Sequence, residues 1–276
     1  MIFKAGKRGQ VTLFVIAAVI AVSVVSIFFM FRTGIVKAPM STEQANQLLS
    51  SKSENLRDYT SECIEQISDA YFQEVLSHGG YYKYGNLNSI NYLDNDNVIL
   101  LYKKDNELRN ELPSLNSICG TGFENYLNEE AYSKLDSCLK DFDPFKMDMD
   151  INPSSERKIE AECRDDDIVI KTDWLFDISR ADASSVVQQK NTRLLIPLRK
   201  MWIISNDILI DEAQGDSFAG GEIENYLSRH ENSLDHILLE SWVVTGDKTV
   251  QHVTSQPYRP GEVQNKFIFA HDTPLI

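Results

Sequence analysis

Residues 157–179 read RKIEAECRDDDIVIKTDWLFDIS, and apolar and polar side chains alternate along most of this stretch. Ile159, Ala161 and Cys163 alternate with charged residues, and IVIKTDWLFDIS follows the acidic segment RDDD, which reads as a turn. A period of two places every second side chain on the same face of a strand. The stretch therefore predicts an antiparallel pair of strands with one face in water.

The same period extends in both directions from this pair. Upstream, KMDMDIN alternates Met147, Met149 and Ile151 with aspartates, so strands are expected to begin soon after Pro144. Downstream, VVQQKNTRLLI continues the meander, and HILLESWVV, TVQHVTS and KFIFA predict strands at the end of the chain. An earlier strand or hairpin is predicted for VILLYKK, which follows the segment DNDN.

A long helix is predicted ahead of these strands. It begins at Ser41, where Gln44 completes a capping box, and ends near Gly79 and Gly80. Its apolar stripe consists of Leu49, Leu56, Tyr59, Cys63, Ile67 and Ala70. We expect this stripe to face the core, and a filament-forming stalk is the alternative.

A second helix is predicted from Thr121, which forms a capping box with Glu124. Its apolar face consists of Phe123, Leu127, Ala131, Leu135, Cys138 and Phe142. Helices followed by an antiparallel sheet define an α+β fold class. Residues 42–276 are expected to form one extracellular α+β domain, because no linker and no internal repeat divides them.

The N-terminal part of the chain has a different character. From Val11 to Phe31 there is no charged residue, and a helix of this length measures roughly 30 Å, the hydrocarbon thickness of a bilayer. The tract is too long for a cleavable secretory signal. The sequence predicts a basic leader (1–10), a transmembrane helix (11–31) and a hinge (32–41), in which Gly34 and Pro39 interrupt the helix.

Charge predicts the orientation of this helix. Lys4, Lys7 and Arg8 precede the tract, and Arg32 and Lys37 follow it, so the N-terminus is expected in the cytoplasm. The chain would cross the cell membrane once, with residues 42–276 outside. Of the 27 basic and 41 acidic residues, the first 32 positions hold four basic and no acidic ones, which leaves a net charge of −18 on the rest. Nucleic acid is therefore excluded as a partner.

The residues at the start of the apolar tract resemble a known type of signal sequence. KRGQ followed at once by VTLFVI resembles the class III, or prepilin-like, signal of archaeal pilins and related surface proteins. The resemblance implies that a peptidase cuts between Gly9 and Gln10 and that the apolar helix stays on the mature protein. An uncut signal anchor is the alternative.

Scattered fragments extend the resemblance beyond the tract. CIEQ, GGYY, SCL, IPL and FIFA are similar to segments of uncharacterised single-span archaeal surface proteins. The family implies location and architecture but no chemistry. The segment LRKMWIISNDILIDEA (198–213) fits either a hairpin or a helix, and the resemblance favours a helix. A short helix is expected for GGEIENYLSRH.

The four cysteines all lie on the predicted outer side, where disulfides persist. Cys138 would lie roughly 26 Å from Cys119 along the second helix, too far for a disulfide. Of the two remaining pairings we favour Cys63 with Cys138, because both lie in apolar stripes, and Cys119 with Cys163. The alternative is four buried free thiols.

The sequence carries no catalytic signature, since Walker, GxGxxG, GxSxG and HExxH motifs are all missing. In RHENSLDH, His230 and His236 lie six residues apart, which suits a solvated turn better than a zinc site. The acidic DNDN lacks the spacing of a calcium loop. We expect no enzyme activity, no cofactor and no metal.

The sequence favours a membrane-anchored extracellular surface protein with a structural or adhesive role, and a pilin-like filament subunit is the sharper version. Its expected partners are membrane lipid, through Val11 to Phe31, and other copies or other surface proteins. The alternatives are an extracellular ligand-binding sensor module and, ranked lower, an extracellular hydrolase that uses paired carboxylates.

Overall fold

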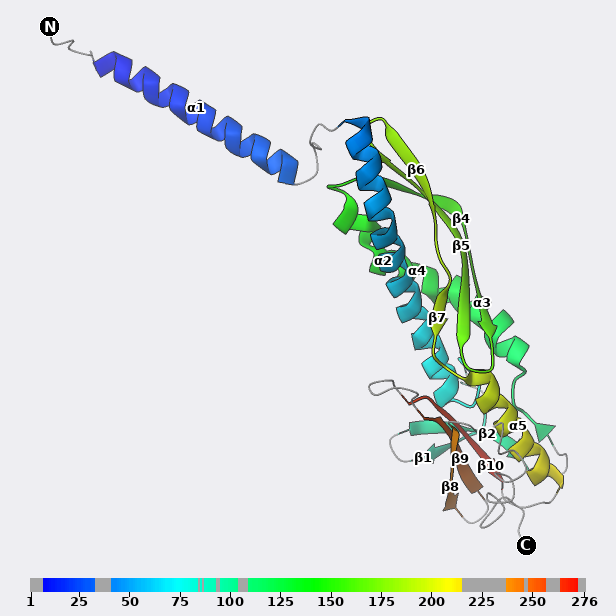
Figure 1. Ribbon diagram of the computed structural model, residues 1–276. Helices are drawn as coiled ribbons and strands as arrows, with labels where there is room; N and C mark the ends of the chain where they lie inside the picture. Colours follow the sequence, from blue (N-terminus) through cyan, green and yellow to red (C-terminus); the bar gives the residue numbers. More distant parts are fainter. Residues whose placement is uncertain are drawn as a thin grey trace. The chain divides into compact units, whose positions relative to one another are not determined.

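A computed structural model of the chain describes residues 7–32, 41–83, 85, 87–92, 95–103, 109–214, 237–245, 248–256 and 264–272 (Figure 1). The chain forms two compact units. The first contains Met1–Tyr59, Leu139–Ser155 and Trp174–Gln188, and the second contains Thr60–Cys138, Glu156–Asp173 and Gln189–Ile276. Helices and sheets occur together, so the α+β class expected from the sequence is confirmed.

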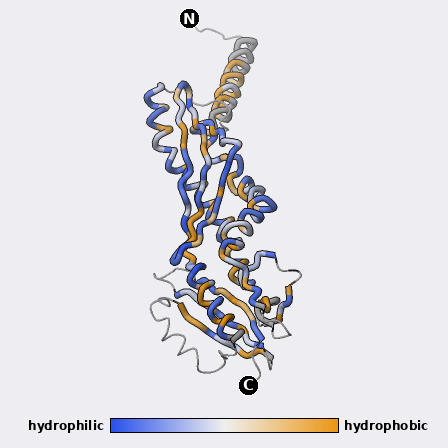
Figure 2. Tube along the Cα trace, turned by 90° about the vertical axis from the view of Figure 1, so that its right-hand side faces the viewer, coloured by the Kyte–Doolittle hydropathy of each residue, from blue (hydrophilic) through white to orange (hydrophobic). Residues whose placement is uncertain are grey.

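The apolar N-terminal tract is helical and forms α1 (Lys7–Arg32). The side chains described in it are those of residues 16–28, all exposed and rich in hydrophobic residues (Figure 2). Within the described part of the chain, no helix combines the length and apolar character needed to cross a membrane. The helical conformation is confirmed, and the membrane span is not. Most of the expected hinge lies outside the described residues.

Helix α2 (Thr42–Ser77) begins and ends where the sequence predicts. The Ser41 amide donates to Gln44 Oε1 at 3.1 Å, and the Gln44 amide donates to Ser41 Oγ at 3.3 Å, which is a capping box. Gly79 and Gly80 end the helix with positive φ angles of 59° and 97°. The predicted stripe is buried at Leu49, Leu56, Cys63 and Ile67. Ala70 is exposed, which corrects one position, because the buried stripe continues through Tyr71 and Phe72.

The second helix is irregular. Two π-helical segments, Ser117–Gly122 and Leu127–Ala131, alternate with α3 (Phe123–Tyr126) and α4 (Tyr132–Leu139), and a 3-10 helix follows at Lys140–Phe145. We call residues 117–139 the mixed helix. The predicted start at Thr121 is wrong, because Ser114 Oγ accepts the Ser117 amide at 3.1 Å and the Ser114 carbonyl accepts the Ile118 amide.

One sheet contains β4 (Asp150–Cys163), β5 (Ile168–Arg180), β6 (Ala183–Gln188) and β7 (Thr192–Leu194). β5 lies between β4 on one side and β6 and β7 on the other. Burial alternates along β5, so one face of the sheet is in water, as predicted. The expected strand at Met147 and Met149 is wrong, because the amides of Asp148 and Met149 donate to the Phe145 carbonyl and form a turn.

The second sheet lies within the second unit. It contains β1 (Ser89–Tyr92), β2 (Asn95–Lys103), β3 (Arg109–Asn110), β8 (Ile237–Thr245), β9 (Lys248–Ser255) and β10 (Lys266–Asp272), in the order β1-β2-β10-β9-β8 with β3 beside β2. The pairing of β10 with β2 is parallel, which corrects the expectation of a purely antiparallel sheet. Such a pair needs a long connection, and more than 150 residues separate these strands.

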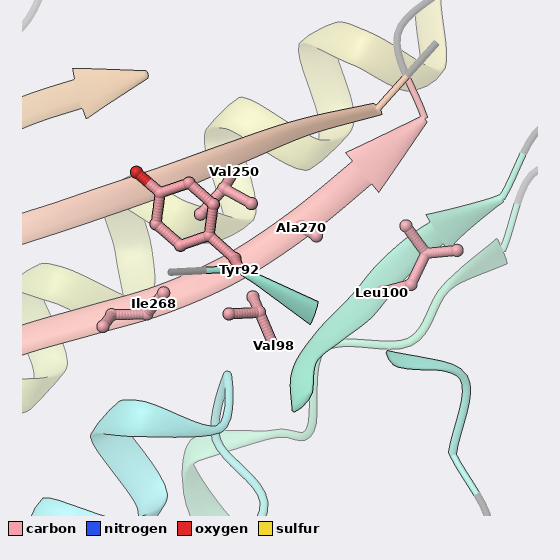
Figure 3. Packing of buried hydrophobic residues seen from close by; sticks show 6 residues of the cluster. All are labelled: Tyr92, Val98, Leu100, Val250, Ile268 and Ala270. Carbon is pink, nitrogen blue, oxygen red and sulfur yellow. The ribbon is translucent and has the colours of Figure 1, made fainter. Parts of the chain in front are cut away.

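Helix α5 (Leu198–Gln214) covers one face of this sheet, which settles the hairpin-or-helix alternative in favour of a helix. On the other face a cluster of buried side chains gathers from four strands (Figure 3). It consists of Tyr92, Val98, Leu100, Val250, Ile268 and Ala270. The segment predicted as a short helix and the sequence RHENSLDH lie outside the described residues.

Candidate binding groove

Two disulfides join segments of the second unit. Cys63 is bonded to Cys138 with Cα atoms 5.8 Å apart, and Cys119 is bonded to Cys163 with Cα atoms 6.1 Å apart. These distances lie in the ordinary range for disulfides, and they are the pairs that the sequence favours. No cysteine is left free. The first bond ties α2 to α4, and the second ties the start of the mixed helix to the end of β4.

A groove of about 450 Å³ lies between the mixed helix and β4. One wall is formed by β4 from Arg157 to Glu162, and the other by residues 116–132. Figure 1 shows α3 beside the hairpin of β4 and β5. Phe123, Leu127 and Ile159, all at most 5% exposed, give the groove an apolar floor. Polar side chains surround this floor, so the groove offers both apolar contact and hydrogen bonds.

One end of the groove is closed by the Cys119–Cys163 disulfide, because Cys119 lines the groove and Cys163 ends β4. The other end is closed by an aromatic and ionic contact. The Arg157 guanidinium lies 4.3 Å from the centre of the Tyr132 ring and donates to Asp136 at 2.5 and 3.3 Å. The groove therefore has two fixed ends that are six strand residues apart.

Ion pairs order the charged rim along β4. Lys158 Nζ lies 2.6 Å from Glu160, and Lys171 Nζ lies 2.7 Å from Glu162. Hydrogen bonds from Arg164 and Lys171 lower the pKa of the Glu162 carboxyl to about 2, and the hydrogen bond to Glu160 raises the pKa of Lys158. The Glu162 carboxylate therefore stays ionised at all physiological pH values.

Glu124 differs from the other carboxylates of the groove. It is exposed on the mixed helix, and its carboxylate makes no hydrogen bond or ion pair with any residue that the structure describes. Its charge is still felt by neighbours, because it helps to raise the pKa values of Tyr132 and Lys158. A carboxylate at the rim of a groove without a paired cation is available to a bound ligand.

A second hollow, of about 330 Å³, lies on another side of the mixed helix. Here the Tyr82 hydroxyl donates to Glu130 at 2.9 Å, and Lys134 Nζ lies 3.0 Å from the same carboxylate. Burial, followed by the hydrogen bond to Glu130, raises the pKa of Tyr82, and hydrogen bonds from Lys134 and Tyr82 lower the pKa of Glu130. Tyr82, Glu130 and Lys134 satisfy one another's hydrogen bonds. These contacts hold the turn after α2 against the mixed helix.

The remaining site predictions concern the processing site and the possible metal-binding residues. Gly9 and Gln10, the expected processing site, lie within α1, and their processing stays a prediction. His230 and His236 lie outside the described residues. In the part of the chain that the structure describes, no group of three or more His, Cys, Asp or Glu side chains could hold a metal ion. Sequence reasoning missed the groove, and the pairing of Cys119 with Cys163 was the one signal that its two walls meet.

Comparison of the chain with protein-family models, with curated proteins and with solved structures finds no match. The resemblance to archaeal single-span surface proteins therefore stays a prediction. The groove and the disulfides supply the evidence on function.

Proposed function

We propose that this chain is a membrane-anchored protein of the outer cell surface with an adhesive or structural role, and that its head binds partners outside the cell. The N-terminus would lie in the cytoplasm, one helix would cross the membrane, and residues 42–276 would lie outside. The two disulfides are the observation that carries the proposal. Disulfides persist in oxidising compartments and are rare in the cytosol, so two bonds with no free thiol favour a head outside the membrane.

The apolar tract supports the anchor. Residues 11–31 carry no charge and form one continuous helix with Lys7 and Arg8 before them. Three basic residues, Lys4, Lys7 and Arg8, precede the tract and two, Arg32 and Lys37, follow it, which favours insertion with the N-terminus inside. The groove supports the binding role, because an apolar floor with a charged rim is typical of recognition sites.

The groove also favours a second candidate, a ligand-binding sensor module of a receptor or transporter. A sensor would respond to a small soluble ligand, whereas an adhesive head would bind a macromolecule. Binding of small amino acids, sugars or ions by the purified chain would favour the sensor.

The anchor is tested by membrane fractionation of the full chain and of a variant with Ala21→Arg and Val22→Arg. Two arginines at the centre of the tract cost about 2.5–3.5 kcal/mol each on insertion, so the variant should leave the membrane fraction. The wild-type chain should stay in the membrane fraction after washing with high salt and with alkaline carbonate. Glu65→Arg, an exposed change in α2, is the control and should not alter fractionation. A wild-type chain found in the soluble fraction would contradict the proposal.

The pilin-like version makes its own prediction about processing. If a prepilin-type peptidase acts on the chain, the mature N-terminus is Gln10, and mass spectrometry of the purified protein would detect it. An N-terminus at Met1 or Ile2 would exclude this version and leave the uncut anchor.

A further inference from the structure

The backbone of β4 exposes a free edge to the groove. Among the described strands β4 pairs only with β5, on one side. The Tyr132 hydroxyl lies 3.5 Å from the Arg157 carbonyl oxygen, so the backbone groups of Arg157 point away from β5 and toward the mixed helix. In an antiparallel pair, alternate residues direct their N–H and C=O groups to the same side. The backbone groups of Ile159 and Ala161 therefore also point into the groove.

These edge groups need partners of a particular kind. The described residues supply no backbone hydrogen bond to Ile159 or Ala161 from the groove side. Free N–H and C=O groups in a row are matched by the backbone of an extended chain, which adds a strand to the sheet. Six residues of strand span roughly 20 Å, the length between the disulfide and the Tyr132–Arg157 contact. The mixed helix forms the far wall of the groove.

The charge of the groove indicates the side chains of this ligand. Along the outer row of β4, Glu160 and Glu162 are already held in ion pairs with Lys158 and Lys171. Glu124, across the groove, makes no ion pair with any residue that the structure describes. Opposite charges on neighbouring strands stabilise pairing, and like charges destabilise it. The head, residues 42–276, holds 22 basic and 41 acidic residues and so carries a net charge of −19, which attracts cationic partners. A ligand with a basic side chain opposite Glu124 fits this arrangement.

We infer that the groove between β4 and the mixed helix binds an extended peptide segment with a basic residue opposite Glu124, as an additional strand beside β4. This inference deepens the binding role of the head and rests on that part of the proposed function. It does not depend on the membrane anchor, so the two can fail separately.

The test measures peptide binding to the full chain purified in mild detergent. The probe is a fluorescent hexapeptide that alternates Thr or Val with Lys, and the matched probe has Glu in place of Lys. Fluorescence anisotropy should show saturable binding of the basic peptide and at least about fivefold weaker binding of the acidic one. A basic peptide N-methylated at alternate residues lacks the donors for the edge and should not bind. Hydrogen exchange should slow at Ile159 and Ala161 in the complex.

Two variants locate the binding to the groove. Glu124→Lys reverses an exposed charge and should weaken binding of the basic peptide at least about fivefold, whereas Glu65→Lys makes the same change of charge outside the groove and should leave it unchanged. Ala161→Pro removes one edge donor and should abolish binding. If circular dichroism shows that Ala161→Pro does not fold, the Glu124→Lys variant and the N-methylated peptide decide whether binding occurs in the groove.

Several results would overturn the inference. One is the failure of the basic peptide to bind, and another is binding that survives N-methylation or Glu124→Lys. A third is a monomer–dimer equilibrium that Glu124→Lys shifts while no peptide binds, because the groove would then be an interface between copies. If one of these results is found and the fractionation experiment gives the expected outcome, the inference about the groove fails and the proposal of a membrane anchor stands.

Discussion

Gly122 occupies a position in the mixed helix where a methyl group has no room. Its backbone is helical, with φ −67° and ψ −45°, so conformation alone would permit any residue. A Cβ atom there would collide with the Ser117 carbonyl oxygen and lie 2.7 Å from the Tyr71 hydroxyl oxygen. That hydroxyl donates to the Ile118 carbonyl at 2.8 Å, so it cannot move without losing a buried hydrogen bond.

We therefore expect Gly122→Ala to lower the free energy of unfolding by about 2 kcal/mol, measured by urea denaturation. Gly120→Ala is the matched control in the same π-helical segment. A Cβ atom at Gly120 would lie 3.1 Å from Asn116 Oδ1, the end of a flexible side chain, so this change should be neutral or mildly stabilising. Equal effects of the two changes would contradict the packing described for Gly122.

Two buried histidines lie on neighbouring strands of the second sheet. Burial lowers the pKa of His271 to about 4, and burial followed by the charge of Lys266 lowers the pKa of His252 in spite of Glu240. Neither ring nitrogen of His252 has a hydrogen-bond partner among the described residues, and the Glu240 carboxylate lies 4.0 Å from Nδ1. Both imidazoles are therefore neutral in the folded chain at pH 7.

Because both folded-state pKa values lie below the unfolded value of 6.5, the unfolded chain binds more protons at pH values below 6.5. Stability should be full above pH 6.5 and should fall toward pH 4, with His271 alone contributing a loss on the order of 3 kcal/mol. Thermal unfolding between pH 7 and pH 4.5 measures this loss. His252→Phe should raise stability at pH 7 and reduce the slope, because it replaces an unpaired buried polar ring. A flat profile would contradict the burial of both rings.

At the scale of elements, the Cys63–Cys138 disulfide joins α2 to α4 across 75 residues of sequence. Closing a loop of this size restricts the unfolded chain, so replacing both cysteines with serine should lower the free energy of unfolding by about 3–4 kcal/mol. Urea denaturation of this double variant measures the loss, and peptide mapping of the unreduced protein checks the pairing. A Cys119–Cys138 linkage, or unchanged stability in the variant, would contradict the role of this bond.

Local sequence patterns predicted the elements that depend on a few neighbouring residues. The capping box at Ser41 placed the start of α2, and alternation placed β5. The same kinds of signal failed at Thr121, where Ser114 caps the helix earlier, and at Met147, where alternation over five residues does not distinguish a strand from a turn. In both cases the backbone hydrogen bonds of the folded chain decide between two local patterns of similar strength.

The candidate groove depends on long-range contacts, which no local pattern contains. Its walls come from residues 116–132, from residues 157–162 and from Lys171. Sequence periodicity described both walls, but not that β4 would be an edge strand or that the mixed helix would lie beside it. The parallel pairing of β10 with β2 was missed for the same reason, because strand order is not written in the pattern of any single strand.

At the scale of the whole molecule, charge is distributed unequally along the chain. The basic residues of the N-terminal segment precede an apolar helix, and the remaining residues carry a net charge of −18 and two disulfides. A basic, cysteine-free leader and an acidic, disulfide-bonded head suit opposite sides of a membrane. This division is the central claim of the proposed function.

Labelling of intact cells with a membrane-impermeant amine reagent tests this claim most directly, because lysines occur on both sides of the tract. Lys134 and Lys158 have side chains 54% and 69% exposed in the head, whereas Lys4 and Lys7 precede the tract. Mass spectrometry should find the two head lysines labelled in intact cells, and Lys4 and Lys7 labelled only after lysis. Protection of the head lysines in intact cells, or labelling of Lys7 before lysis, would contradict the account.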